Sequence, residues 1–317
     1  MRAVRTPEPA DLVAANVVVG RELSMTPVVP VAGFGADVAM KLETFQPTGS
    51  FKVRGALVAV AGALGRDADR PVVAASAGNH GLGVAFAADR LGARATVVVP
   101  VTASPVKLAA LERSGVRLVR RGNSYDEAER HALALAGEGA HFISPYNDPE
   151  VIAGQGTIGL ELFEQVPDLS TIVAPVGGGG LLAGLALAAT TVTGVRVVGV
   201  EAAMSRAFSA ALDAGHVVPV EVGATLADGL AGNLEPGTVT LELARRYPTE
   251  VLAVTEAEIE DAIRFLAAEH GLVAEGSAAA ALAPLLGGRI TSGPGTTVVV
   301  LTGRNIAPAT LARVLGH

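Results

Sequence analysis

Two successive series of short, largely apolar segments, each followed by a helical pattern, constrain the fold of this chain more than any other feature. The segments are residues 71–75, 95–99 and 116–119 in the first series, and 171–176, 195–200 and 296–301 in the second. Strands without polar alternation are typical of parallel sheets covered by helices on both faces. The alternation therefore predicts an α/β protein with two open, mostly parallel sheets. Any site is expected in the cleft beyond the carboxyl ends of the strands.

The composition argues against several classes of partner. Among 317 residues the formal net charge is −7 and 3% are aromatic, which disfavours nucleic acids and anionic membrane surfaces. The chain has no cysteine, which excludes disulfides, thiolate metal sites and a cysteine nucleophile. Residues 169–195 carry no charge, but Pro175 and four glycines interrupt them, so a buried strand, loop and helix is expected there. No secretory signal is visible at the N-terminus, and we expect a cytoplasmic protein that does not enter a membrane.

Lys52 is one of three lysines among the 24 lysine and arginine residues of the chain. Arginine can replace lysine as a solvated charge, but it cannot become a neutral amine nucleophile. Ser50 is a suitable N-cap for a helix that begins here, and both the helix start and partial burial disfavour an ammonium ion. These features favour a reactive amine, while a surface lysine with its head in water is the alternative.

Four consecutive glycines lie between an expected strand and an expected helix, namely Gly177, Gly178, Gly179 and Gly180. Backbone N–H groups in such a loop can close on a phosphate at the helix N-terminus. Residues 178–183 also fit the dinucleotide-binding fingerprint, with Glu201 at the end of the next strand as the ribose ligand. Close packing of helix on strand is a third interpretation of the glycines. The loop predicts an anion without identifying it.

A second loop, Ser76-Ala77-Gly78-Asn79-His80, also joins an expected strand to an expected helix. Its amides could hold a carboxylate, and the side chain of Asn79 could hydrogen-bond a ring oxygen. His80 is either a helix-start residue without chemistry or a member of the site. Thr302 follows the last buried strand, where its hydroxyl either offers one neutral hydrogen bond to a cofactor or belongs only to a turn.

Taken together, these loops resemble the fold-type-II pyridoxal-phosphate (PLP) enzymes, specifically the threonine/serine dehydratase and serine racemase family. The motifs follow the family's order along nearly the whole chain: Lys41-Leu42-Glu43, residues 46–56, 76–81 and 175–180, Glu201, Asp228-Gly229, Glu275 and Leu301-Thr302-Gly303. The resemblance implies a tryptophan-synthase-β-like fold with the active site between two domains. Residues 1–46 and 148–317 would form the large PLP-binding domain, and residues 47–147 the small domain.

The resemblance also implies roles for single residues. Lys52, beside Phe51, would bind the aldehyde of PLP covalently and later remove the Cα proton of the substrate. The remaining cofactor contacts would be Gly177–Gly180 for the phosphate, Asn79 for the 3′-oxygen, Thr302 for the pyridine nitrogen, and Glu275. The α-carboxylate of an amino-acid substrate would bind Ser76, Ala77, Gly78, Asn79 and His80. The implied reaction, in a homodimer, is loss of water from L-threonine or L-serine and release of a 2-oxo acid and ammonia.

Three positions depart from the family pattern. Ala77 stands where the racemases carry a serine, and alanine cannot exchange a proton, so racemase activity is not favoured. The family's metal site keeps Glu201 but has Ala207 at its second acidic position. A divalent cation is therefore not expected, and Glu201 could be a solvated strand-end residue. Arg304 stands where glycine or alanine is usual, and either pairs with a second acidic group of the substrate or points to solvent, as most arginines do.

Several alternatives stay open from the residues alone. A 3-hydroxyaspartate dehydratase, suggested by Arg304, and a serine racemase belong to the same family. The glycine loop with Glu201 also permits a nicotinamide-dependent oxidoreductase, and a PLP-binding protein without catalysis is a further alternative. Purified protein separates them, because a PLP enzyme is yellow and loses its visible band with borohydride, whereas the oxidoreductase is colourless and binds NADH.

Overall fold

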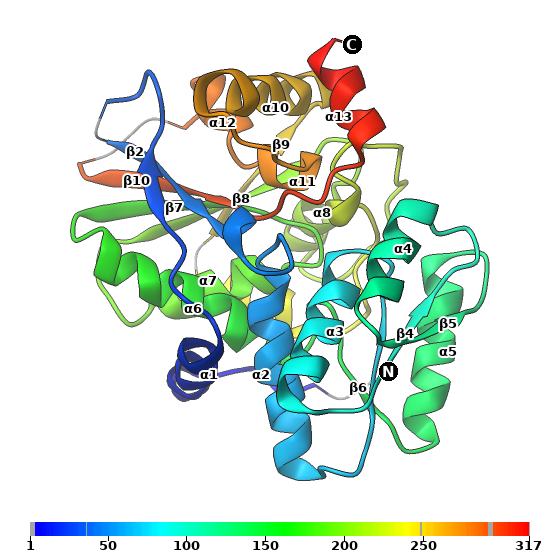
Figure 1. Cartoon of the computed structure of the whole chain (residues 1–317). Helices are drawn as coiled ribbons and strands as arrows, with labels where there is room; N and C mark the ends of the chain where they lie inside the picture. The colour runs from blue at the N-terminus through cyan, green and yellow to red at the C-terminus, as the bar shows by residue number, and fades with distance from the viewer. Residues whose placement is uncertain (1–3, 36, 248, 291–293, 317) are drawn as a thin grey trace.

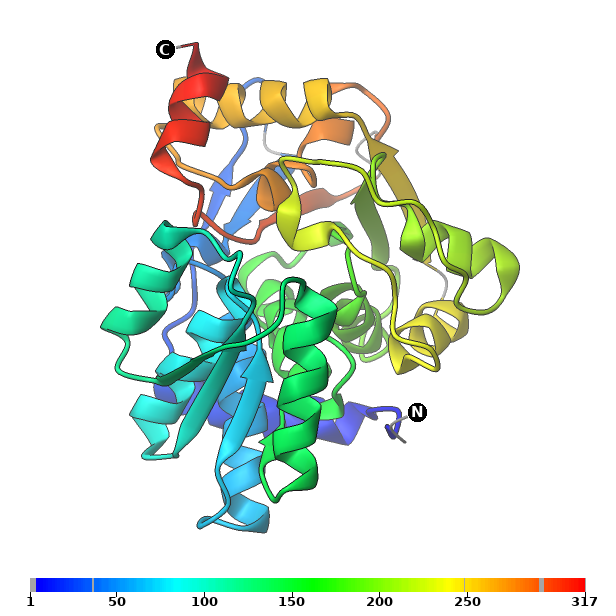
Figure 2. The same cartoon turned by 90° about the vertical axis from the view of Figure 1, so that its right-hand side faces the viewer.

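The structure, a computed structural model, describes residues 4–35, 37–247, 249–290 and 294–316 and contains two β-sheets (Figure 1). The strands of the six-stranded sheet are β1 (Val28–Pro30), β2 (Val38–Leu42), β7 (Leu169–Pro175), β8 (Arg196–Ala202), β9 (Thr249–Val254) and β10 (Thr296–Leu301). The strands of the four-stranded sheet are β3 (Val72–Ala75), β4 (Ala95–Val99), β5 (Arg117–Arg120) and β6 (His141–Phe142). The four-stranded sheet lies below the six-stranded sheet in two perpendicular views (Figures 1 and 2).

Both sheets are open and mostly parallel, as predicted. The six-stranded sheet has the order β1-β2-β10-β7-β8-β9, in which β1 pairs antiparallel with β2 and the other pairs are parallel. The four-stranded sheet has the order β5-β4-β3-β6 and is parallel throughout. The expected α/β class is therefore confirmed.

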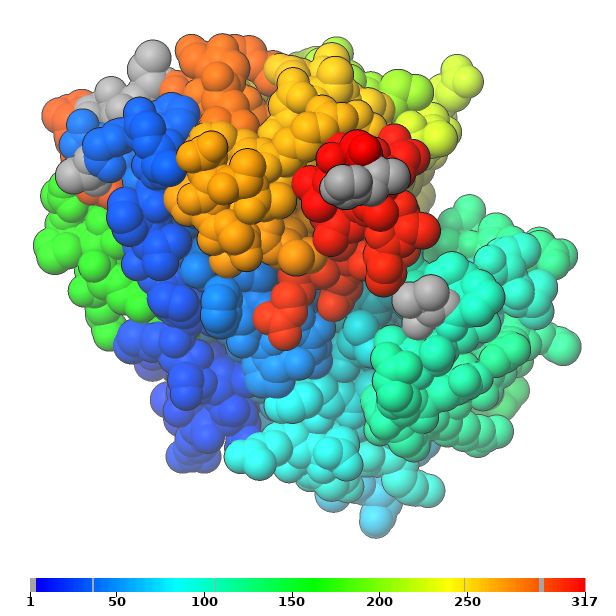
Figure 3. Space-filling model, turned by 45° about the horizontal axis from the view of Figure 1, so that its top comes forward, coloured from blue at the N-terminus to red at the C-terminus, as the bar shows by residue number. Residues whose placement is uncertain are grey.

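Helices cover both faces of the six-stranded sheet, because its central strands are apolar on both sides. On β10, Val298 and Val300 pack in a cluster with residues of α6 (Pro149–Gln165) and α7 (Gly180–Ala189). The alternate residues Val299 and Leu301 pack in a second cluster with residues of α10 (Glu256–His270), α11 (Gly276–Ala279), α12 (Ala283–Leu286) and α13 (Pro308–Leu315). Figure 3 shows α10 and α13, in orange and red, side by side on the outer surface.

The remaining helices connect the two sheets or cover the four-stranded sheet. They are α1 (Pro9–Glu22), α2 (Lys52–Arg66), α3 (Asn79–Leu91), α4 (Pro105–Arg113), α5 (Tyr125–Gly137), α8 (Ala207–Ala214) and α9 (Val239–Arg246), with the short 3₁₀ helices η1 (Glu43–Phe45) and η2 (Asp228–Leu230). Val53 and Leu57 of α2 share an apolar cluster with Val84 of α3 and Val72 of β3. The helix that begins at Lys52 is thereby packed against the four-stranded sheet and its first helix.

Several helices begin at residues of the types that favour N-caps. Ser104 and Ser124 accept N-cap hydrogen bonds at the starts of α4 and α5, and Thr255 with Glu258 forms a capping box at the start of α10. The alanine-rich stretch before Leu286 forms two separate helices, α11 and α12. Pro284 has no N–H to donate within a continuous helix, which explains the interruption.

Among the described residues, none of the helices combines the length and apolar character that crossing a membrane requires. The uncharged stretch of residues 169–195 forms β7, the glycine loop and α7, as the sequence predicts.

Candidate active site

The predicted site loops follow the carboxyl ends of parallel strands, where ligands of open α/β sheets bind. Residues 76–78 follow β3, residues 143–148 follow β6, the glycine loop follows β7, Thr302 follows β10, and Lys52 is reached from β2 through η1. Three of these strands belong to the six-stranded sheet and two to the four-stranded sheet. Contacts between the loops then decide which residues form one site.

Lys52 is the first residue of α2, and its amine turns toward the segment that follows β6. The Lys52 Nζ donates a hydrogen bond to the carbonyl oxygen of Pro145 at 2.8 Å and lies 5.2 Å from the centre of the Phe51 ring. Burial lowers the pKa of Lys52 to about 8, although the carboxylate of Glu275 opposes this shift. Ser50 was expected as the N-cap; the helix begins just after Phe51, and the Ser50 hydroxyl accepts from the Lys52 N–H at 3.2 Å. The chain thus carries an amine with a sizeable neutral fraction near neutral pH.

The end of β10 lies against the start of α2. The Phe51 N–H donates to the carbonyl oxygen of Thr302 at 3.0 Å, and Gly303 forms an isolated antiparallel bridge with Ser50. Thr302 is 1% exposed. These contacts place Thr302 beside the start of the Lys52 helix although 250 positions separate the two residues in the chain.

A hydrogen bond joins Asn79, the first residue of α3, to Glu275, which precedes α11. The Asn79 Nδ2 donates to Glu275 Oε1 at 2.8 Å, and the Asn305 Nδ2 donates to Asn79 Oδ1 at 2.6 Å. Burial raises the pKa of Glu275 to about 6, while the hydrogen bond from Asn79 opposes the shift. Both proposed cofactor residues are therefore in one hydrogen-bonded group, with Asn305 as an additional member.

The glycine loop is held closely from both sides, and this explains two of its glycines. A side chain at Gly178 would overlap the ring of Tyr146, and one at Gly179 would overlap the ring of Phe208. Gly179 also has a φ of +83°, a conformation that favours glycine. The packing interpretation is thus correct for Gly178 and Gly179.

The same loop presents free backbone donors, which is the property a phosphate requires. Within the described residues, the N–H groups of Gly177, Gly178 and Gly179 donate no hydrogen bond, and no side chain caps α7. Unsatisfied amides at a helix N-terminus bind anions through their partial positive charge. The loop therefore fits the phosphate of PLP.

The loop before α3 is only partly as expected. The Ser76 hydroxyl accepts from the Gly78 N–H at 3.1 Å, and the methyl group of Ala77 packs near the apolar cluster of β4 and α4. The ring of His80 turns away, with Nε2 3.0 Å from the carbonyl oxygen of Ile143, and burial lowers the pKa of His80 to about 3. His80 is therefore a neutral residue whose side chain supports the segment after β6.

A buried charge cluster anchors α2 through Arg54, two residues after Lys52. The guanidinium of Arg54 binds the carboxylate of Glu43 at 2.8 Å and that of Glu161 at 2.6 Å, and Lys41 also pairs with Glu161. Lys41, Glu43 and Arg54 are 0% exposed. The cluster ties the start of α2 to η1 and α6, so the position of Lys52 depends on it.

Glu201 and Arg304, for each of which the sequence left two interpretations open, lie outside the charge cluster. Glu201 is not a solvated strand-end residue, since it is 1% exposed and accepts hydrogen bonds from the side chain and backbone of Ser209. Burial raises the pKa of Glu201. The exposed Arg304 folds back on the protein, where its guanidinium donates to the carbonyl oxygen of Thr44. Among the described residues there is no cluster of three or more histidines and acidic residues placed to hold a metal ion.

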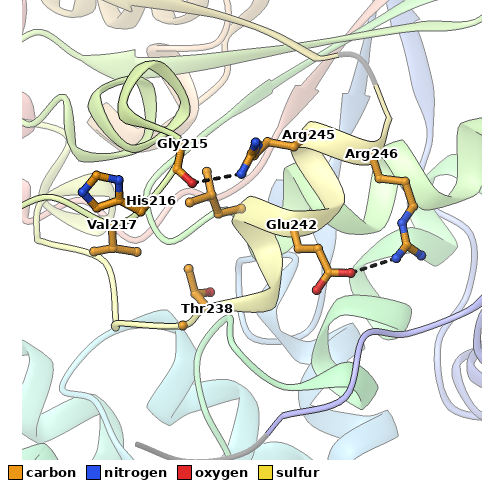
Figure 4. A pocket seen from close by; sticks show the side chains of 9 residues that line it. Gly215, His216, Val217, Thr238, Glu242, Arg245 and Arg246 are labelled. Carbon is orange, nitrogen blue, oxygen red and sulfur yellow. Dashed lines mark hydrogen bonds and ion pairs between the residues drawn. The ribbon is translucent and has the colours of Figure 1, made fainter.

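A surface cavity of about 510 Å³ lies elsewhere, between the turn after α8 and helix α9 (Figure 4). Arg245 donates to the carbonyl oxygen of Gly215 there, and Arg246 pairs with Glu242 at 2.8 Å. None of the predicted site residues lines this cavity.

Two residues after β6 are absent from the sites predicted from the sequence. Pro145 provides the acceptor for Lys52, and Tyr146 packs on the glycine loop while its hydroxyl accepts from the Glu235 N–H at 2.8 Å. Their position after a short parallel strand is a signal that could have identified them.

Comparison with known proteins identifies the family. Residues 20–303 match the family described as pyridoxal-phosphate dependent enzyme. The chain is 42% identical over 283 residues to an L-threonine ammonia-lyase of Thermotoga maritima, covering 89% of this chain and 70% of the relative. It is 35% identical over 284 residues to the catabolic L-threonine dehydratase of Escherichia coli K12, covering 88% and 86%.

Solved structures give the same result for the fold. Maize serine racemase superposes with a TM-score of 0.91 at 29% identity, over 98% of this chain and 97% of that chain. The processed form of threonine deaminase isoform 2 from Solanum lycopersicum superposes with a TM-score of 0.88 at 30% identity, over 98% and 89%. The resemblance drawn from the sequence motifs is confirmed.

Proposed function

The chain belongs to the family of pyridoxal-phosphate dependent enzymes, and we propose that it is an ammonia-lyase that acts on L-threonine, L-serine or both. The observation that carries the proposal is the position of the Lys52 amine, 2.8 Å from the carbonyl of Pro145, which directly precedes the tyrosine that packs on Gly178. The Lys52 amine is thus connected, through Pro145 and Tyr146, to a loop that fits a phosphate. Relatives described as L-threonine ammonia-lyase and L-threonine dehydratase support this reaction.

When bound, PLP supplies an electron-withdrawing ring that makes the Cα–H bond of an attached amino acid acidic. We assign its covalent attachment to Lys52, its phosphate to the amides of the glycine loop, and its ring nitrogen to the hydroxyl of Thr302. Asn79, Glu275 and Phe51 complete the proposed cofactor contacts. The hydrogen bond from the Phe51 N–H to Thr302 and that from Asn79 to Glu275 support the grouping of these residues.

Lys52 is also the proposed base: the amino group of the substrate would replace Lys52 on the aldehyde carbon of PLP, and the freed amine, with a pKa of about 8, is partly neutral at physiological pH. It removes the Cα proton, and the β-hydroxyl then leaves as water. The released enamine reacts with water to give a 2-oxo acid and ammonia. The start of α3 is the proposed site of the substrate α-carboxylate, through Ser76, Ala77, Gly78, Asn79 and the backbone of His80.

Two related activities are less well supported. Racemisation needs a second proton donor, and Ala77 has none to offer. A 3-hydroxyaspartate dehydratase would need a cation for the second carboxylate, whereas the guanidinium of Arg304 already donates to the carbonyl of Thr44. The family match also favours PLP over the nicotinamide alternative.

The test is a panel of β-hydroxy amino acids, scored for 2-oxo acid and ammonia with and without a chelator. We expect L-threonine or L-serine to give equal amounts of both products, with no effect of the chelator, and Lys52→Ala to give neither product. A protein that binds PLP but releases no 2-oxo acid from any of these substrates would overturn the lyase proposal and leave a binding protein.

Three further expectations belong to this proposal. We propose a large domain of residues 1–46 and 148–317 and a small domain of residues 47–147, supported by the division of the strands between the two sheets.

We propose a homodimer, supported by Val13 and Val17, which lie one turn apart on α1 and are 66% and 50% exposed. Light scattering of Val17→Asp tests the dimer, which should become monomeric. A cytoplasmic location stays a prediction, to be checked by cell fractionation.

A further inference from the structure

Thr240 is a buried residue that the proposed function does not yet use. It lies in the first turn of α9 and is 0% exposed. Its hydroxyl donates a hydrogen bond to the carbonyl oxygen of Gly178 at 2.8 Å, across 62 positions of the chain. A side chain from a distant helix therefore holds one peptide of the glycine loop.

The hydroxyl of Thr240 is itself oriented by its neighbour. The Thr238 Oγ1 lies 2.9 Å from the Thr240 Oγ1 and accepts from the Thr240 N–H at 3.4 Å. Each hydroxyl has one proton, and that of Thr240 is used on Gly178, so the Thr238 hydroxyl is the donor to Thr240. The result is a directed chain from Thr238 through Thr240 to the loop.

The geometry of the peptide bond makes this contact matter for the loop amides. A trans peptide is planar, with its C=O and N–H pointing in opposite directions. Holding the Gly178 carbonyl on the side of Thr240 turns the Gly179 N–H to the opposite side, and that N–H has no acceptor within the described residues. A run of glycines can otherwise rotate its peptides at little cost.

We propose that Thr240 is a positioning residue that fixes the Gly178–Gly179 peptide with its N–H toward the phosphate of the cofactor. This inference rests on the proposed function, in which the glycine loop binds that phosphate. Without the hydroxyl, the peptide is free to turn its carbonyl oxygen toward the phosphate, where two negative groups repel each other. Loss of the Thr240 hydroxyl should therefore weaken the binding only of ligands that carry a phosphate.

The test compares PLP with pyridoxal, which has the aldehyde and ring but no phosphate. The affinity of the full-length apo-protein for each is measured from the visible absorbance in wild type, Thr240→Val and Thr240→Ser. We expect Thr240→Val to weaken PLP binding about tenfold, corresponding to one lost hydrogen bond, and to leave pyridoxal binding unchanged. Thr240→Ser keeps the hydroxyl and should restore the affinity for PLP.

Thr190→Val is the matched control, because the Thr190 hydroxyl donates to the carbonyl of Leu187 at 2.7 Å at the opposite end of α7. It should change neither affinity. If Thr240→Val does not fold, Thr238→Val tests the same chain, with an expected loss of about two- to fivefold for PLP alone.

Equal losses for PLP and pyridoxal, or no loss for either, would overturn the role of Thr240 while the wild-type preference for PLP still supports the glycine loop. A wild-type protein that binds both compounds equally would instead overturn the phosphate role of the loop, and this inference with it.

Discussion

The amine of Lys52 and the carbonyl oxygen of Pro145 lie 2.8 Å apart, although 93 positions separate them in the chain. The contact joins the first turn of α2 to the segment that follows β6, at the carboxyl end of the four-stranded sheet. The next residue, Tyr146, packs on the glycine loop of the six-stranded sheet. The amine is thereby held between the two sheets, where the proposed cofactor and substrate loops meet.

The attachment of PLP should follow the titration of Lys52. Burial lowers the pKa of Lys52 from 10.5 to about 8, and only the neutral amine attacks an aldehyde. The initial rate of PLP attachment to apo-protein should rise about tenfold per pH unit below pH 8 and level off above it. Stopped-flow absorbance from pH 6 to 10 measures this rate. A rate that keeps climbing through pH 10 would show an unperturbed amine.

Glu275 should make the apo-protein less stable as the pH rises. Its folded-state pKa is raised from 4.5 to about 6, so the folded state binds the proton more tightly, and stability falls between these two values. Glu275→Gln cannot ionise, and its stability relative to wild type should improve by about 2 kcal/mol between pH 4.5 and pH 7. Urea unfolding at several pH values measures the difference.

Glu258→Gln is the control, because its stability relative to wild type should change with pH in the opposite direction. Burial opposes the shift, but hydrogen bonds from Thr255 lower the pKa of Glu258, so ionised Glu258 stabilises the folded state. This variant should lose stability relative to wild type as the pH rises toward 4.5, the unfolded-state value, and should change little above it, where Glu275 acts. Equal pH profiles for wild type and Glu275→Gln would show that Glu275 has an ordinary pKa.

Removing the cation of Arg54 should destabilise the protein strongly. Arg54→Met leaves the buried carboxylates of Glu43 and Glu161 without their main partner, which we expect to lower the free energy of unfolding by about 3–5 kcal/mol. Arg66→Met is a matched control on the same helix, because the exposed pair of Arg66 with Glu150 contributes less than about 1 kcal/mol. Chemical unfolding of both variants gives the comparison, and similar losses would contradict the role of the buried cluster.

Gly178→Ala should weaken PLP binding by displacing the glycine loop. The added methyl group would overlap the ring of Tyr146, so the loop has to move. Tyr146→Ala in the same chain removes the overlap, and the double variant should bind PLP better than Gly178→Ala alone. Gly65→Ala is the control, since no atom lies within 4 Å of its added methyl group and helix α2 should gain up to about 1 kcal/mol. A double variant that binds no better would contradict this packing.

Some features that depend only on neighbouring residues are visible in the sequence. The cap of Ser104 on α4 and the box of Thr255 and Glu258 on α10 are examples, because a cap involves residues two or three positions apart, whereas the cap expected at Ser50 differs, since α2 begins after Phe51. Helix α1 was not predicted: its run of valines at Val17–Val19 is unfavourable for a helix, and packing of Ala15 and Val19 against Ala153 of α6 outweighs this preference.

The site shows the same limit. Residue type and position identified Lys52, the glycine loop and Thr302, because a scarce amine, four glycines and a strand end are visible in the sequence. The partners that contact them are a proline carbonyl, a tyrosine ring and a threonine hydroxyl. The place of Pro145 and Tyr146 after a short parallel strand is a weak signal, whereas Thr240 becomes recognisable only when the fold brings its hydroxyl to Gly178.

Borohydride reduction of the PLP-saturated protein, followed by peptide mass mapping, tests the central claim most directly. With only Lys41, Lys52 and Lys107 in the chain, each lysine can be resolved separately. We predict that the pyridoxyl-phosphate group is found on Lys52 in stoichiometric amount, with Lys41 and Lys107 unmodified. A label on either of the other lysines, or no label at all, would contradict the account.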